Sequence, residues 1–211
     1  MKSRALSEGP RLRADFATHK DAIRARLQEF SAVPPEDYFY ELVYCLLTPQ
    51  SSAVHAGVVV TLLRESDVLH RDLPMEKILR ERSHYIRFHN TKSQRIREAR
   101  ARIAHIVLEI HNTPDSPKLR AWLVANVKGL GWKEASHFLR NIGRKDLAIL
   151  DRHILKNLVR FKVIRSTPKT LTPKRYLAIE KKFAEFAVET GITMDELDLL
   201  FWSRETGQIL K

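Results

Sequence analysis

Apolar residues recur at three- and four-residue spacing along almost the whole chain, which is the period of an amphipathic α-helix. No stretch shows the alternation of apolar and polar residues that marks a half-buried strand. The pattern therefore predicts an all-α protein. The expected helices cover about residues 11–30, the stretch from VPPED to TPQ, and residues 51–64, 74–81, 92–111, 116–127, 132–143, 152–161, 173–189 and 194–205.

Capping residues predict where several of these helices begin and end. Asp115 or Ser116, Asp151 and Thr172 each precede a helix as an N-cap, and Gly143 follows one as a C-cap. A capping box formed by Thr193 and Glu196 opens the last helix.

The apolar positions also predict which side of three helices is buried. The expected core positions are Phe39, Leu42, Val43, Leu46 and Leu47 in the second helix, Ile96, Ala99, Ile103, Ile106, Val107 and Ile110 in the fifth, and Ala135, Phe138, Leu139 and Ile142 in the seventh. The side of the fifth helix opposite these positions is basic.

The charge of the chain indicates a polyanionic partner. Thirty-seven Lys and Arg residues against twenty-five Asp and Glu residues give a net charge of +12. Nucleic acid suits this excess, although acidic membranes and ribosomal RNA also bind basic chains. Cys45 is the only cysteine, which excludes a disulfide framework, a four-cysteine zinc site and a cysteine-ligated iron–sulfur cluster. The lack of a long apolar run or a signal peptide predicts a soluble intracellular protein.

The segment VKGLGWKEASHFLRNIG joins two predicted helices through Gly129 and Gly131, with Leu130 pointing inward between them. Glycine lets a phosphate approach the backbone, and the amides that open the following helix favour an anion. We interpret the segment as a helix-hairpin-helix that binds a nucleic-acid backbone without reading bases. The alternative is an ordinary short connection between antiparallel helices.

Two polar residues near this hairpin call for an explanation. Lys133 stands in the first turn of a helix, where the helix dipole disfavours a cation. Asp151 follows the apolar run LAIL and opens the next helix. Taken singly, Lys133 is explained as a solvated lysine and Asp151 as an N-cap. Together with the glycine hairpin, they form a more specific arrangement.

This arrangement resembles the helix-hairpin-helix superfamily of DNA glycosylases. The stretch KGLGWKEASHFLRNIG…DLAILDRHILKNL resembles the 8-oxoguanine DNA glycosylase/lyase class of archaea and some bacteria, and YCLLTPQS, YIRFHNTKSQRI and LFWSRETGQILK extend the likeness over most of the chain. The superfamily commonly has glycine and proline before the aspartate, whereas the class resembled here shares LAIL. The chain also lacks the C-terminal four-cysteine cluster of the endonuclease III branch.

The resemblance implies two helical subdomains flanking a basic cleft. Residues 1–35 would form a helix that packs with the C-terminal helices. Residues 36–144 would form a helical barrel ending in the hairpin motif at about 119–143, and residues 145–211 would carry the catalytic aspartate. By this likeness Lys133 is the Schiff-base lysine and Asp151 the catalytic carboxylate of a bifunctional enzyme that excises 8-oxoguanine and cleaves the strand by β-elimination.

Further residues are candidates for contacts with DNA. The duplex must release the target nucleotide, and Gln50 and Phe88 are candidates to contact the opened stack. Alternatively, Gln50 is an ordinary polar residue at a helix end and Phe88 is an aromatic residue of the core. Within YIRFHNTKSQR, the candidate phosphate contacts are His89, Lys92 and Arg95, with a solvated basic face as the alternative. The resemblance implies that Lys211 helps recognise the oxidised guanine and that Trp202 packs near it.

Two rival functions stay open. One is a glycosylase of the same superfamily for another oxidised base, and the other is a non-catalytic helix-hairpin-helix protein that binds DNA. We expect no cofactor and no metal, since none of the nine histidines has a convincing metal-ligand spacing. The expected partner is double-stranded DNA containing an oxidised guanine, bound by a cytoplasmic, nucleoid-associated monomer without a membrane partner.

Overall fold

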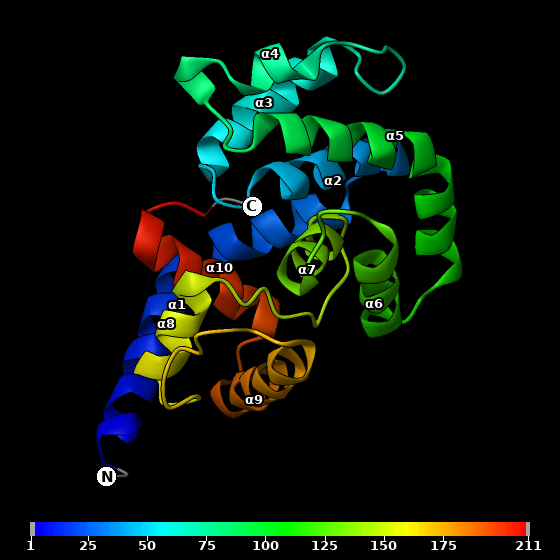
Figure 1. The fold of residues 1–211 in the computed structure, drawn as a ribbon. Helices are drawn as coiled ribbons and strands as arrows, with labels where there is room; N and C mark the ends of the chain where they lie inside the picture. The colour runs from blue at the N-terminus through cyan, green and yellow to red at the C-terminus, as the bar shows by residue number, and fades with distance from the viewer. Residues whose placement is uncertain (1–2, 210–211) are drawn as a thin grey trace. The chain divides into compact units, whose positions relative to one another are not determined.

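The computed structural model describes residues 3–209, and every regular element in that range is helical, with no strand (Figure 1). The prediction of an all-α protein is therefore confirmed. The chain divides into two compact units, of which unit 1 combines Met1–Ala32 with Leu139–Lys211 and unit 2 is Val33–Phe138.

Unit 2 is built around a helix that is buried along nearly its whole length. Its elements are η1 (Pro35–Asp37), α2 (Tyr38–Leu47), α3 (Ala53–Glu65), α4 (Met75–Leu79), η2 (Arg82–His84), α5 (His89–Asn112), α6 (Ser116–Asn126) and the first two turns of α7 (Trp132–Asn141). Every residue of α2 from Phe39 to Leu47 is buried, because α3 and α5 both pack against it. The five predicted core positions of this helix are confirmed.

Unit 1 is assembled from both ends of the chain. It contains α1 (Ser3–Ser31), the last residues of α7, α8 (Arg152–Arg160), α9 (Pro173–Thr190) and α10 (Met194–Thr206). Helix α10 packs against α1, α8 and α9, and all its residues from Met194 to Phe201 are buried. Arg140 at the end of α7 forms a buried ion pair with Asp198 of α10, with 2.6 Å between Nη1 and Oδ2. Its guanidinium also lies over the ring of Phe30.

The observed caps agree with the predicted ones. The side chains of Asp115, Asp151 and Thr172 each accept a backbone hydrogen bond from the first turn of their helices, and Thr193 and Glu196 form the full capping box. Gly143 follows α7 with a φ of +84°. Helix α1 begins earlier than predicted, at Ser3, because Pro10 is accommodated within it.

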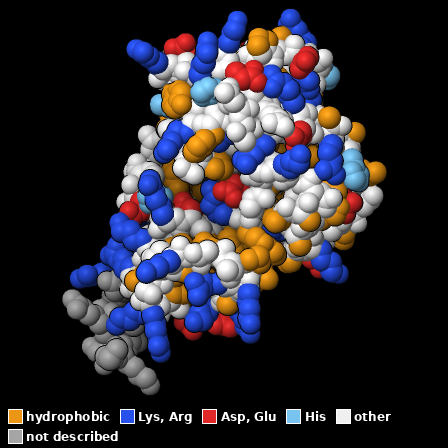
Figure 2. Space-filling view, in the orientation of Figure 1, with side chains coloured by type: hydrophobic (Ala, Val, Ile, Leu, Met, Phe, Trp, Pro, Cys, Tyr) orange, Lys and Arg blue, Asp and Glu red, His pale blue; other side chains and the backbone are white. Residues whose placement is uncertain are grey.

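The buried stripe of α7 is confirmed at all four predicted positions. In α5 the stripe is confirmed at Ile96, Ala99, Ile106 and Ile110, whereas Ile103 and Val107 are only half-buried. Lys and Arg side chains are spread over the whole visible face of the molecule (Figure 2). Among the described residues no helix is both long and apolar enough to cross a membrane.

Candidate functional site

The hairpin between α6 and α7 is a tight turn that only glycine can complete. The N–H of Leu130 donates to the carbonyl of Val127 at 3.2 Å, and the Leu130 side chain is buried as expected. Gly129 has a φ of +97°, and a Cβ added there would lie 2.6 Å from Cδ of Arg95 and 3.0 Å from Cδ2 of Leu46. The hairpin backbone is therefore pressed against α2 and α5 at a position that excludes a side chain.

The second glycine of the hairpin opens α7 and leads into Lys133. The carbonyl of Gly131 accepts the hydrogen bond of Ala135, so Gly131 caps the helix. Glu134 Oε2 accepts the N–H of Gly131 at 3.2 Å, which is one half of a capping box. The Nζ of Lys133 lies 3.2 Å from Oε1 of Glu134, with the lysine side chain 26% exposed. Lys133 is thus a partly buried amine held next to the hairpin.

A group of cations surrounds this part of unit 2. Lys92 is only 2% exposed, and burial lowers its pKa to about 8, with further contributions from the charges of Arg95, Arg87 and Lys133. These four residues, Arg87, Lys92, Arg95 and Lys133, are called the cationic cluster below. The cluster joins the start of α5 to the start of α7, and it creates a positive field where the hairpin begins α7.

The expectation that Lys92 contacts a phosphate is wrong for this structure. Its Nζ donates to the carbonyls of Leu47 and Pro49, each at 2.7 Å, and to Oγ of Ser51 at 3.1 Å. An ammonium has three N–H donors, and all three are engaged inside the protein. Arg95 and His89 are half-buried, and Nδ1 of His89 has no hydrogen-bond partner within residues 3–209.

Gln50 and Phe88 are both exposed and both have left-handed backbone conformations. Their φ values are +56° and +59°, which non-glycine residues rarely adopt and which often mark functional sites. The Phe88 side chain is 53% exposed, so the alternative of a core aromatic is excluded. Its ring lies under the guanidinium of Arg87, 5.5 Å from Cζ to the centroid.

Asp151, in unit 1, is held by the apolar segment before it and by the helix after it. Residues 147–150 are buried outside any helix or strand, so their backbone groups need other partners. Helix α9 supplies partners for three of these groups: Glu180 Oε2 accepts the N–H of Ala148, while the Tyr176 hydroxyl accepts the N–H of Leu150 and donates to the carbonyl of Ala148. The segment LAIL thereby fixes the position at which α8 begins.

The Asp151 carboxylate uses one oxygen for its structural role. Oδ1 accepts the backbone hydrogen bonds of His153 and Ile154, each at 2.8 Å. Oδ2 makes no hydrogen bond or ion pair with any residue that the structure describes. The N-cap role is therefore present, and the second oxygen is left for other chemistry.

Trp202 lies against the helix that Asp151 opens. Its ring packs edge-on against His153, with 6.3 Å between the centroids. His153 also lies 3.8 Å from Glu205, which bonds Lys156 at 2.7 Å. Trp202 and Asp151 are thus brought to the same end of α8. Lys211 lies outside the described residues.

The predicted site residues fall into both units. Unit 2 carries Gln50, Phe88, Gly129, Gly131 and Lys133, and unit 1 carries Asp151 and Trp202. Within unit 2, Oγ of Ser51 accepts hydrogen bonds from the backbone N–H of Arg87 and from Nζ of Lys92, which connects the Gln50 and Phe88 segments. The cationic cluster of the same unit includes Lys133.

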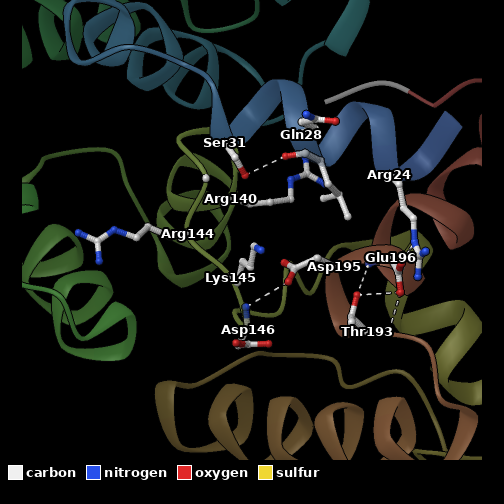
Figure 3. Close-up of a pocket in the computed structure, with 12 residues that line it drawn as sticks. Arg24, Gln28, Ser31, Arg140, Arg144, Lys145, Asp146, Thr193, Asp195 and Glu196 are labelled. Atoms are coloured by element: carbon white, nitrogen blue, oxygen red, sulfur yellow. Dashed lines mark hydrogen bonds and ion pairs between the residues drawn. The ribbon is translucent and has the colours of Figure 1, made fainter. Parts of the chain in front are cut away.

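Unit 1 also contains a pocket of about 370 Å³ that neither Asp151 nor Trp202 lines (Figure 3). Arg24 and Glu196 form an ion pair on one side of it, with 2.8 Å between Nε and Oε1. On another side the carboxylate of Asp195 accepts the N–H of Asp146 at 3.2 Å. Burial raises the pKa of Asp195 to about 6. Within residues 3–209 no three side chains of the metal-binding types are grouped so that they could hold a metal ion.

Sequence reasoning missed the structural role of Lys92, although the chain contained a signal for it. Lys92 lies four residues before Ile96 and seven before Ala99, on the buried stripe of α5. A lysine at an apolar position of such a stripe indicates a buried ammonium with internal acceptors. The role of Glu134 in holding the hairpin was also missed.

Comparison with known proteins identifies relatives along the whole chain. The family model described as 8-oxoguanine DNA glycosylase matches residues 23–192. A protein of Fusobacterium nucleatum named 8-oxoguanine DNA glycosylase/AP lyase is 40% identical over 220 residues, covering 100% of this chain and 99% of its own length.

Two solved structures from Methanocaldococcus jannaschii share the fold. The 8-oxoguanine DNA glycosylase of that organism superposes with a TM-score of 0.87 at 32% identity, covering 98% of this chain and 97% of the other. A second structure, of the 8-oxoguanine glycosylase/lyase in complex with a 15mer DNA containing 8-oxoguanine, gives a TM-score of 0.82 at 35% identity and covers 91% and 93% of the two chains.

Proposed function

Because this chain belongs to the 8-oxoguanine DNA glycosylase family, we propose that it excises 8-oxoguanine from double-stranded DNA and then cleaves the strand at the abasic site. The observation that carries the mechanism is the position of Lys133, a partly buried amine in the first turn of the helix that the glycine hairpin opens. A lysine whose only role is to be solvated would not need to be partly buried in the first turn of this helix.

Lys133 is the nucleophile in this proposal. The lone pair of its unprotonated Nζ forms a bond to C1′ of the deoxyribose while the bond from C1′ to the base breaks, and the base leaves with the electron pair and takes up a proton. Opening of the sugar ring gives a protonated imine between Nζ and C1′. Loss of a C2′ proton then expels the 3′ phosphate by β-elimination, and water releases the lysine.

Asp151 stabilises the positive charge that develops on the sugar as the base departs. Its Oδ1 is occupied by the α8 cap, which orients the carboxylate, and its Oδ2 is the oxygen that faces the reacting sugar and accepts a proton. In this proposal residues 36–144 form a helical barrel that ends in the hairpin motif and carries Lys133, and residues 145–211, which pack with residues 1–35, carry Asp151.

The remaining predicted residues bind the substrate. Gly129 and Gly131 let the hairpin backbone approach a phosphate, with the side chains of Arg87 and Arg95 supplying the attractive field. Gln50 and Phe88 contact the stack from which the target nucleotide has been turned out. Trp202 packs near the flipped base, and Lys211 helps recognise its oxidised edge. The enzyme acts as a cytoplasmic, nucleoid-associated monomer.

A panel of lesion duplexes tests this function. We expect release of 8-oxoguanine, measured by mass spectrometry, together with strand cleavage on the same duplex, and much slower release of an oxidised pyrimidine. Preferential release of the pyrimidine would favour a glycosylase for another lesion. DNA binding without any base release or strand cleavage would favour a non-catalytic binding protein.

A further inference from the structure

Lys92 is a buried ammonium whose hydrogen bonds converge on one short turn. Its three acceptors are the carbonyls of Leu47 and Pro49, each at 2.7 Å, and Oγ of Ser51 at 3.1 Å. An ammonium is expensive to bury, and it is tolerated here because three oxygens replace its hydration. A side chain that served packing alone would have no need of the charge.

The turn that Lys92 binds carries Gln50. The residues on either side of Gln50 both accept from Lys92 Nζ, and the N–H of Ser51 donates to the carbonyl of Thr48 at 3.0 Å. Gln50 itself has a left-handed backbone and an exposed side chain. A non-glycine residue keeps that conformation only when its surroundings enforce it, and the Lys92 hydrogen bonds supply the enforcement.

The same hydrogen-bond group reaches Phe88. The backbone N–H of Lys92 donates to the carbonyl of Phe88 at 2.9 Å. Ser51 Oγ, which accepts from Lys92 Nζ, also accepts the backbone N–H of Arg87 at 3.0 Å. Two exposed residues with left-handed backbones, far apart in sequence, are thus tied together through Lys92 and Ser51.

We infer that Lys92 is a positioning residue, which fixes Gln50 and Phe88 as a rigid pair for insertion into the opened duplex. The inference rests on the proposed function and deepens it, because it explains how side chains on two separate turns keep one geometry. A rigid pair loses little conformational entropy when it enters the stack, so more of the binding energy is left to hold the nucleotide outside.

The charge of Lys92 is maintained against its surroundings. Burial disfavours the ammonium, and the charges of Arg95, Arg87 and Lys133 repel it further, so its pKa falls to about 8. Near neutral pH the ammonium still keeps the three donors that the turn requires. The positioning role therefore requires the protonated form of Lys92, because only the ammonium carries three N–H donors.

The test compares Lys92→Met, which keeps the length and loses the donors, with the control Lys77→Gln, which removes an exposed lysine of α4 in the same unit. Three quantities are measured: single-turnover release of 8-oxoguanine from a duplex, fluorescence of 2-aminopurine placed beside the lesion, and strand cleavage at a preformed abasic site in a single-stranded oligonucleotide. The last substrate has no stack to open.

For Lys92→Met we expect base release and the 2-aminopurine signal to fall by about tenfold, while cleavage of the single-stranded abasic site changes by less than about twofold. The control is expected to match the wild type in all three. An equal loss in all three assays, or no loss of base release, would overturn the positioning role.

A milder variant keeps the test decisive if Lys92→Met does not fold, as judged by circular dichroism. Ser51→Ala removes only the oxygen that joins the two turns, and we expect it to lower base release about threefold with single-strand cleavage unchanged. Base release equal to that of the wild type would then overturn the inference. Failure of the proposed function can be told apart from failure of the positioning role, because in the first case the wild-type enzyme itself would release no 8-oxoguanine.

Discussion

Oδ1 of Asp151 lies 2.8 Å from the backbone nitrogen of Ile154 and caps α8, while Oδ2 makes no hydrogen bond or ion pair with a described residue. The carboxylate of Asp151 therefore has a structural role as the N-cap of α8 and a proposed chemical role at the sugar. A substitution that keeps the cap and removes the charge separates these two roles. Asparagine caps a helix about as well as aspartate but carries no charge.

We predict that Asp151→Asn leaves the free energy of unfolding within about 0.5 kcal/mol of the wild type. We also predict that it slows base release about a hundredfold, because the developing cation loses its carboxylate. Urea denaturation and single-turnover kinetics measure the two effects. Asp115→Asn, at the N-cap of α6, is the matched control and should change neither. Wild-type turnover in Asp151→Asn would rule out the catalytic role.

The hairpin glycine provides a second prediction. Gly129→Ala places a Cβ at a φ of +97° and 2.6 Å from Cδ of Arg95, so it should destabilise the fold by about 2 kcal/mol and weaken DNA binding. Gly57→Ala is the control. That glycine lies within α3 with no atom near the added Cβ, so the change should stabilise the helix by about 0.5–1 kcal/mol. Thermal unfolding and a DNA titration report both effects, and a Gly129→Ala protein with normal stability and affinity would contradict the account of the hairpin.

A third prediction concerns the buried carboxyl of Asp195. Burial raises its pKa to about 6 from a reference of 3.8, although Arg140, Lys145 and the N–H of Asp146 oppose the shift and the charge of Asp146 adds to it. The native state therefore binds this proton more tightly than the unfolded state does. The wild type should gain stability from this group as the pH falls from about 6 to 4.

The variant Asp195→Asn removes the charge and keeps an oxygen for the N–H of Asp146. Its stability advantage over the wild type should be larger at pH 7 than at pH 4, by at most about 3 kcal/mol. Urea denaturation of the wild type and of Asp195→Asn at the two pH values gives the free energies of unfolding that are compared. A difference that is the same at both pH values would show that Asp195 does not titrate as proposed.

Local signals in the sequence predicted the helices and their caps, because a cap depends only on neighbouring residues. Thr193 and Glu196 lie three residues apart, and their capping box follows from that spacing. The support of Asp151 by Tyr176 and Glu180 depends on how α9 packs, which the spacing of residues along the chain does not determine. The charge of Lys92 suggested a surface role, whereas its position on the buried stripe of α5 determined where it lies. The roles of Lys133 and Asp151 remain predictions.

The most direct test of the account is borohydride trapping on a duplex with one 8-oxoguanine, using wild type, Lys133→Gln and the control Lys77→Gln. We predict a covalent protein–DNA adduct with wild type and control, and none with Lys133→Gln. An adduct of equal yield from Lys133→Gln would contradict the assignment of the nucleophile. No adduct from the wild type, on this duplex or on one with an abasic site, would contradict the imine mechanism altogether.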